Sequence, residues 1–139
     1  MITFSYLFHL NDFRKYEVYL KLWITQVILF ENKKRGDITY IICDDDQLLE
    51  INLKFLNHDT YTDIISFPTS NNTNIISGEI FISLPRVIEN AKLNQSKPFD
   101  EYSRVVIHGI LHLIGYNDHT PEEKEEIRAK EDYYLTLRP

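Results

Sequence analysis

The sequence predicts an α+β fold, in which helices pack on a small mixed sheet within a single domain spanning residues 1–139. Three observations predict it. Short runs rich in β-branched and aromatic residues alternate with longer runs of helical periodicity. Their order is strand, helix, strand, helix, two strands and then helices, which is typical of a mixed sheet covered by helices. The chain has 139 residues, 43 % of them apolar, which is enough for one hydrophobic core.

The first half of the chain begins with a predicted strand over residues 2–8, which are rich in Ile, Phe and Tyr. Asp12 can cap a helix that runs to about Asn32. Gly36 is expected to end this helix, with three cations favourably placed at its negative end, Lys33, Lys34 and Arg35. The apolar positions of the helix recur at helical spacing: Tyr16, Tyr19, Leu20, Trp23, Val27 and Phe30.

The central segment contains a second strand, residues 37–43, and a helix that reaches about Leu56. Three consecutive carboxylates, residues 44–46, precede that helix. They could bind a cation, but acidic residues are commonplace at a helix N-terminus, and we favour that interpretation. A short strand from Ile64 to Phe67 ends at a proline. A surface loop of residues 69–74 leads to a further strand over residues 78–84.

The second half is predicted to be helical. Pro85 suits the first turn of a helix that ends near Asn94, and a longer helix is expected from Phe99 to Ile114. Gly115 provides a left-handed cap for the longer helix. Residues 120–123, Thr-Pro-Glu-Glu, form a capping box that opens a last helix.

Composition narrows the function classes. The formal charge is −6 and the pI is near 5.3, so the overall field does not attract nucleic acid, and RNA binding would need a local basic patch. Residues 33–35 are the obvious cluster, although a solvated helix end explains them as well. The other cations, scattered later in the chain, are Arg86, Lys92, Lys97 and Arg104.

The chain is expected to be cytoplasmic and free of membrane segments. Its N-terminus has no basic region and no cleavage site of a signal peptide. The longest apolar stretch, residues 18–30, is too short and too polar to cross a bilayer. The single cysteine, Cys43, ends a strand that we expect to be buried, so we interpret it as a core residue rather than a reactive thiol.

The stretch of residues 108–119, His-Gly-Ile-Leu-His-Leu-Ile-Gly-Tyr-Asn-Asp-His, predicts a metal site. His108 and His112 are four residues apart, so they lie one turn apart on one helical face, where both imidazoles can bind one ion. The turn at Gly115 can bring back a third ligand. Three protein ligands would leave the fourth position of a zinc ion to water, as in catalytic sites. A pair of hydrogen-bonded core histidines is the alternative that we disfavour.

A zinc peptidase or amidase is one function that such a helix permits. Zinc peptidases place a glutamate directly after the first histidine, where it acts as the general base. Gly109 occupies that position here, which counts against this alternative.

Three sequence blocks resemble the YbeY family of bacterial endoribonucleases, and the resemblance runs from about Gly36 to the C-terminal helix. The family motif is His-Gly-x-Leu-His-Leu-x-Gly-Tyr-Asp-His, and residues 108–116 match its first nine positions. Residues 52–68 are similar to a family block that ends Thr-Asp-Val-Leu-Ser-Phe-Pro. Residues 78–82, Gly-Glu-Ile-Phe-Ile, resemble the family's Gly-Asp-Ile strand.

The chain departs from the family pattern at two places. One extra residue follows Tyr116, so Asp118 occupies the usual position of the third ligand and His119 comes one residue later. Register favours Asp118 and ligand type favours His119, and zinc accepts both. The family also has an arginine, thought to contact RNA phosphate, where this chain has Leu56. His58 and Arg86 are candidate substitutes for that arginine, although each is as readily a surface residue.

The resemblance implies a zinc-dependent endoribonuclease of single-strand type with one Zn²⁺ per chain. It would act in 3′-end maturation of small-subunit (16S) ribosomal RNA and in ribosome quality control. Its partners would be ribosomal RNA and the small subunit or its proteins, without membrane or DNA. The implied catalytic residues are His108, His112, Asp118 and His119. The candidates for orienting or proton-transfer roles are Asp63, Glu79 and Asp118. A non-catalytic assembly factor with structural zinc remains an alternative.

Overall fold

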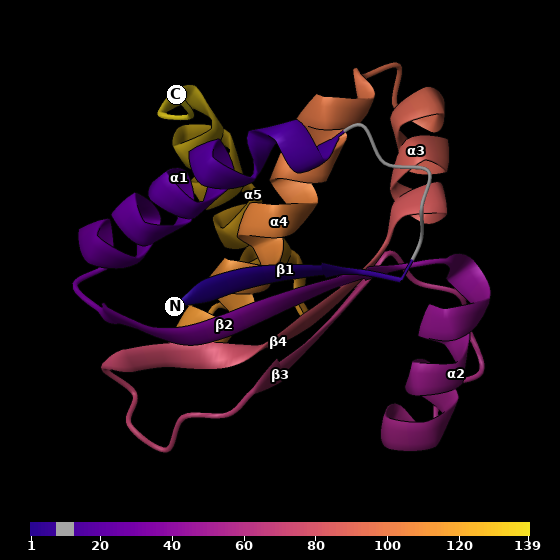
Figure 1. Ribbon diagram of the computed structural model, residues 1–139, viewed down its shortest axis with the longest axis horizontal. Coiled ribbons are helices and arrows are strands. Elements are labelled where there is room, and N and C mark those ends of the chain that lie inside the picture. Colours follow the sequence, from indigo (N-terminus) through magenta and orange to yellow (C-terminus); the bar gives the residue numbers. More distant parts are fainter. Residues whose placement is uncertain (8–12) are drawn as a thin grey trace.

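A computed structural model describes residues 1–7 and 13–139, and it confirms the predicted α+β class. Figure 1 shows a four-stranded sheet with helices on both of its faces. The strands are β1 (Ile2–Tyr6), β2 (Lys34–Cys43), β3 (Ile64–Pro68) and β4 (Ile75–Ser83). The helices are α1 (Glu17–Phe30), α2 (Asp45–Leu56), α3 (Leu84–Leu93), α4 (Pro98–Ile114) and α5 (Pro121–Thr136), and a 3-10 turn, η1 (Phe13–Tyr16), precedes α1.

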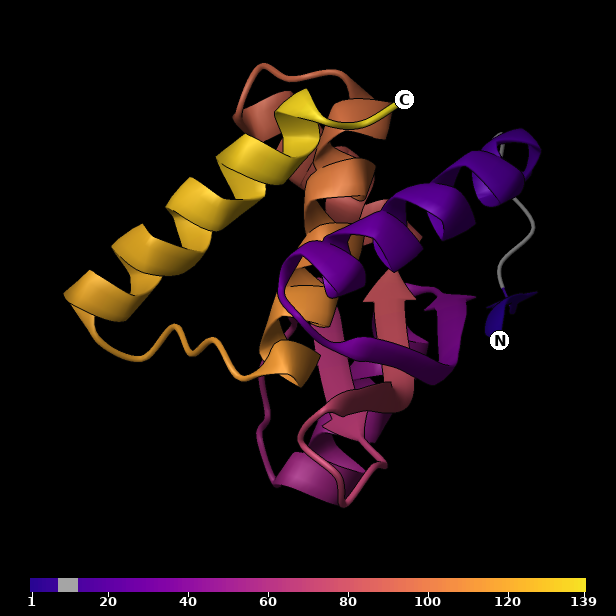
Figure 2. The same ribbon diagram turned by 90° about the vertical axis from the view of Figure 1, so that its left-hand side faces the viewer.

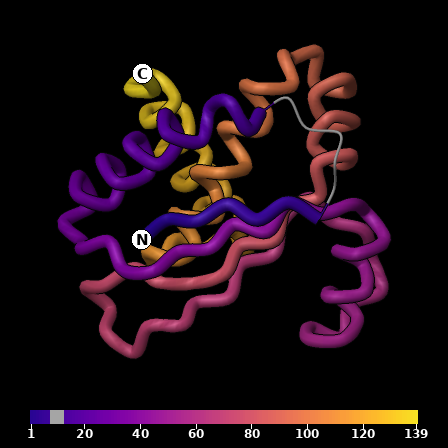
Figure 3. Tube along the Cα trace, viewed as in Figure 1, coloured from indigo at the N-terminus to yellow at the C-terminus, as the bar shows by residue number. Residues whose placement is uncertain are grey.

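The sheet is mixed, with the strand order β1-β2-β4-β3. β1, β2 and β4 are parallel neighbours, and β3 runs antiparallel to β4 at one edge. Parallel neighbours require a crossover, and the chain makes the first one through α1, as its path in Figure 3 shows. β3 is followed directly by β4, so these two strands need only the loop of residues 69–74 between them.

The main core lies between the sheet and the helices α1, α3, α4 and α5, which share one face (Figures 1 and 2). Side chains alternate across a strand, so Ile38, Tyr40 and Ile42 of β2 all point to this face and are fully buried. The Tyr40 hydroxyl donates to the Val106 carbonyl at 2.9 Å, which fixes α4 on the sheet. The position of α4 matters because the predicted ligands lie on it.

The opposite face of the sheet is covered by α2. A smaller cluster of Cys43, Leu48 and Ile65 fills the space beneath it. Burial raises the pKa of the Cys43 thiol to about 12, so the interpretation of Cys43 as a core residue agrees with its position. Asp44 caps α2 by accepting from the Gln47 amide at 2.8 Å, so the expected acidic helix opening is confirmed.

The end of α1 differs from our expectation, because Gly36 does not stop this helix. Asn32 adopts a left-handed conformation with φ 61°, and the Lys33 amide donates to the Ile28 carbonyl at 3.0 Å. These features form a Schellman cap, in which asparagine replaces the usual glycine. Lys34 and Arg35 therefore begin β2 rather than ending α1. Gly36 lies where a Cβ would be 2.0 Å from the Ser77 hydroxyl oxygen, so the close approach of β4 explains the glycine.

Other differences concern element boundaries. The expected cap residue, Asp12, lies outside the described residues, as does the predicted end of the first strand at residue 8. The strands β2 and β4 each begin three residues earlier than expected, because their first residues pair with each other, Lys34 with Ile75. No helix in the described part of the chain is long and apolar enough to cross a membrane.

Candidate metal centre

The two predicted histidine ligands lie one turn apart on α4. The helix is held by its buried side, where Val106, Ile107 and Ile110 pack in the core. His108 and His112 lie on the half-buried side, and their Nε2 atoms are 2.9 Å apart. Packing of one face therefore aims both imidazoles at the same point in space.

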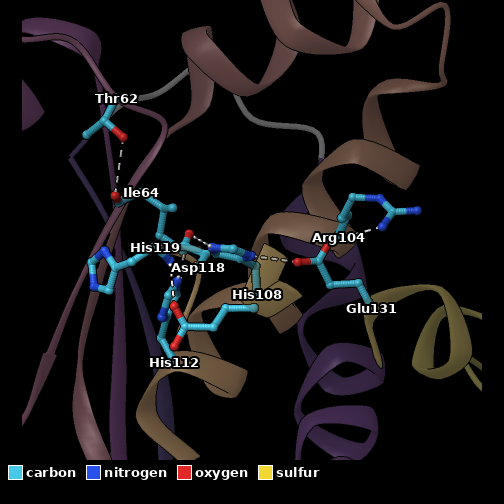
Figure 4. Close-up of polar contacts among 9 residues, drawn as sticks. Thr62, Ile64, Arg104, His108, His112, Asp118, His119 and Glu131 are labelled. Carbon is cyan, nitrogen blue, oxygen red and sulfur yellow. Dashed lines mark hydrogen bonds and ion pairs between the residues drawn. The ribbon is translucent and has the colours of Figure 1, made fainter. Parts of the chain in front are cut away.

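The third donor comes from the segment beyond α4. Gly115 ends the helix with φ 125°, and the Tyr116 amide donates to the Leu111 carbonyl at 3.0 Å. This reversal brings Asp118 Oδ2 to 3.3 Å from His112 Nε2 and 3.5 Å from His108 Nε2. Among the described residues, His108, His112 and Asp118 form the one group of three donors within reach of a single ion. Figure 4 shows the exposed His119 with its ring turned away from them.

These three donors fit a small divalent cation. Zinc bonds of about 2.0–2.1 Å in a tetrahedron place neighbouring ligand atoms about 3.3–3.4 Å apart. The three separations here are 2.9, 3.3 and 3.5 Å, so the donors already span a triangle of that size. Two imidazoles and a carboxylate are also a ligand set that such ions accept. The cluster can therefore hold a metal ion and leave one position open.

Glu131 of α5 orients the first histidine. Its Oε2 lies 2.6 Å from His108 Nδ1, and its Oε1 accepts from Arg104 at 2.9 Å (Figure 4). A carboxylate at Nδ1 holds the proton there and leaves the Nε2 lone pair for a metal. Glu131 is not among the residues that the sequence motifs single out. Its signal was available, because Glu131 shares the buried stripe of α5 with Ile127 and Tyr134 at spacings of four and three residues.

The pKa values of the two imidazoles are shifted in opposite directions. Burial lowers the pKa of His108, but the hydrogen bond and charge of Glu131 outweigh it, and the net shift is upward. Burial and the neighbouring charge of His108 lower the pKa of His112. His112 therefore presents a neutral nitrogen at neutral pH, as a metal ligand must.

A cleft of about 640 Å³ opens over the triangle. Residues from α2, β3, α4 and the loop between α2 and β3 line it, among them Asn52, Thr62, Asp63, Ser66 and Leu113. Asp63, an expected orienting residue, is half-buried here, and burial raises the pKa of its carboxyl. Glu79, another expected residue, is exposed on the sheet face opposite α4 and does not line the cleft.

A model of the family described as endoribonuclease YbeY matches residues 9–137. The chain belongs to the YbeY family. A protein named endoribonuclease YbeY from Flavobacterium psychrophilum is 47 % identical over 138 residues, which is 99 % of this chain and 96 % of that protein. Its counterpart from Cytophaga hutchinsonii is 47 % identical over 119 residues, 86 % of this chain and 83 % of that protein.

The fold agrees with a solved structure. The solution structure of TM1509 from Thermotoga maritima superposes with a TM-score of 0.69 at 28 % identity, covering 97 % of this chain and 87 % of that one. The predicted resemblance to the YbeY family is confirmed by the family model and by these relatives.

The place of the expected YbeY arginine is apolar in this chain. Leu56 lines the cleft at the end of α2, and His58 lines it two residues later. Arg86 does not replace the arginine at the cleft, because it is bound to Asp45 at 2.6 Å and does not line this space. Of the two candidate substitutes, the structure therefore brings only His58 to the site.

Gly109 explains why this YbeY chain has no peptidase glutamate. It faces the sheet, where a Cβ would lie 3.0 Å from side-chain atoms of Ile64 and of Ile80. A glutamate at this position would point into the packed core and away from the cleft. The absence of the general base is thus a consequence of how closely α4 packs on β3 and β4.

Proposed function

We propose that this chain is a cytoplasmic, zinc-dependent endoribonuclease of single-strand type that acts in 3′-end maturation of 16S ribosomal RNA and in ribosome quality control. The observation that carries the proposal is the triangle of His108, His112 and Asp118, open to a cleft, in a member of the YbeY family. The relatives named endoribonuclease YbeY supply the reaction class. Ribosomal RNA is the proposed substrate, and the small subunit or its proteins are the proposed partners.

Each residue has a distinct proposed role. His108, His112 and Asp118 are the ligands of one zinc ion, and His119 stands at the rim of the cleft as a contact for RNA. When bound, the ion supplies polarisation of a phosphoryl oxygen and a water molecule of lowered pKa. Glu131 keeps the His108 proton on Nδ1. Asp63 is the proposed proton-transfer group, because its carboxyl lines the cleft and burial raises its pKa above the usual value.

Cleavage of a structured RNA carrying the 3′ region of small-subunit RNA tests the reaction. The wild-type protein should cut it, and His112→Ala should abolish cutting. Glu125→Ala, which removes an exposed side chain of α5 outside the cleft, is the control and should retain most of the activity. Equal cleavage by wild type and His112→Ala would mean that the triangle does not carry the reaction.

Elemental analysis of protein purified without added metal tests the identity of the ion and its third ligand. We expect about one zinc per chain in the wild type and in His119→Ala, and loss of zinc in Asp118→Ala. Retention of zinc in Asp118→Ala but not in His119→Ala would assign the third ligand to His119 instead. Nickel or iron in place of zinc would overturn the proposed metal.

A further inference from the structure

A second hollow of about 340 Å³ adjoins the triangle on the side of α5. It shares Asp63, Ile64, His108 and Asp118 with the cleft, so the two spaces meet at the proposed zinc site. Its remaining wall comes from α4 and α5, with Glu101, Arg104, Val105, Lys124, Ile127, Arg128 and Glu131. An RNA strand lying across the triangle would therefore extend from the cleft into this hollow.

Two cations of the second hollow are unpaired among the described residues. Lys124 and Arg128 are exposed, lie one turn apart on α5, and form no ion pair or side-chain hydrogen bond in the described part of the chain. Arg104 differs from them, because Glu131 and Asp132 bind its guanidinium at 2.9 and 2.6 Å. Like charges one turn apart destabilise a helix, so a bound anion would relieve a repulsion that the free chain retains.

The cleft itself has no such charge. Of the residues that the structure describes, no lysine or arginine lines the cleft, and Leu56 stands where the YbeY arginine is expected. Binding of an RNA strand depends on cations that neutralise its phosphates, whereas this protein carries a formal charge of −6. The cations that neutralise RNA phosphates near the proposed zinc site must therefore come from the second hollow, on the side of α5.

We propose that Lys124 and Arg128 bind backbone phosphates of the RNA strand next to the cleaved linkage, as the strand leaves the zinc site along α5. This inference rests on the proposed endoribonuclease function. Phosphate contacts fix the position of a strand without reading its sequence. The acidic groups of the hollow do not prevent binding, because Glu131 is bound by Arg104 and His108, and Asp118 faces the triangle. Glu101 and Asp63 are the two carboxylates that would limit where the phosphates lie.

The test compares two double variants with the same change in charge. Lys124→Gln/Arg128→Gln removes the proposed phosphate contacts. Lys92→Gln/Lys97→Gln removes two exposed cations near the opposite end of α4, outside both hollows. All four side chains are exposed, so both variants should fold, and thermal melts check this. Binding is measured on the zinc-loaded chain by anisotropy of a labelled single-stranded phosphorothioate RNA, which keeps its backbone charge and resists cleavage.

The α5 double variant should bind this RNA about tenfold more weakly, and the slope of log Kd against log salt concentration should decrease by about 1.4, or about 0.7 per lost contact. On cleavable RNA its KM should rise while kcat stays near the wild-type value. The control double variant should bind like the wild type. Equal weakening of RNA binding in both double variants, or no weakening in the α5 double variant, would overturn the inference. If the wild type still cleaves RNA in that case, the proposed function stands. Failure of the wild type to cleave or bind RNA would overturn both.

Discussion

Glu131 is a carboxylate whose two oxygens serve different partners, His108 Nδ1 at 2.6 Å and Arg104 at 2.9 Å. We expect Glu131→Gln to weaken zinc binding by about 10- to 100-fold, because the neutral amide holds the His108 tautomer less firmly. Competition with a chromophoric chelator measures the affinity.

Asp132→Asn is the matched control for this residue. Asp132 also binds Arg104, at 2.6 Å, but it has no contact with His108. Its replacement should leave zinc affinity close to the wild-type value. A loss as large as that of Glu131→Gln would assign the effect to Arg104 rather than to orientation of the imidazole.

At the residue scale, the sequence predicts ligands better than the groups that orient them. His108 and His112 are recognisable because their spacing matches one helical turn. Glu131 follows them by about twenty residues, and only the packing of α5 on α4 brings it to Nδ1. The sequence leaves Asp118 and His119 as alternatives for the third ligand, because a turn after Gly115 can aim either side chain at the two histidines. The backbone geometry of that turn places Asp118 beside them.

Among the elements, α1, α5 and the turn after α4 are joined through Glu31 at the end of α1. Its carboxylate accepts from Tyr116 at 2.6 Å, from Lys130 at 3.1 Å and from the Tyr134 hydroxyl. Burial acts to raise the pKa of Glu31, but these three donors outweigh it and lower the pKa below its usual 4.5. The negatively charged carboxylate of Glu31 therefore anchors the turn that carries Asp118.

We expect Glu31→Gln to reduce the free energy of unfolding by about 2 kcal/mol at pH 7, since hydrogen bonds to a charged acceptor are lost. A lowered pKa stabilises the fold above pH 4.5, and this contribution disappears as the pH falls through the folded-state value. Urea denaturation should show a smaller difference in the free energy of unfolding between Glu31→Gln and the wild type at pH 3 than at pH 7. Glu125→Gln, a change at an exposed position of α5, should differ little from the wild type at either pH. A Glu31→Gln destabilisation that persists at pH 3 would contradict the charge-based account.

The order of helices and strands could be predicted because each element has its own periodicity, but their pairing could not. Lys34 and Arg35 look like the cationic end of a helix, and their place in β2 depends on Ile75 and Ile76, about forty residues later. For the same reason the antiparallel direction of β3 at the sheet edge was not predictable from its own five residues.

For the whole molecule, the proposed zinc ligands lie beside the core rather than within it. The main core includes Trp23, Tyr40 and Tyr102, whose burial does not involve the triangle. We expect chelator to lower the melting temperature by a few degrees through lost binding energy, while the far-UV circular dichroism of the folded chain is retained. Restored zinc should restore the melting temperature. Loss of helical signal on chelation would instead support the alternative of a structural ion.

The only cysteine of the chain is packed beneath α2, on the sheet face opposite the histidines. The three candidate ligands offer nitrogen and oxygen, and the thiol has a pKa near 12, so almost no thiolate exists at neutral pH. Peroxide and thiol-blocking reagents consequently meet no cysteine sulfur at the proposed zinc site. Such a centre should keep its metal under oxidative stress that empties cysteine-ligated zinc proteins.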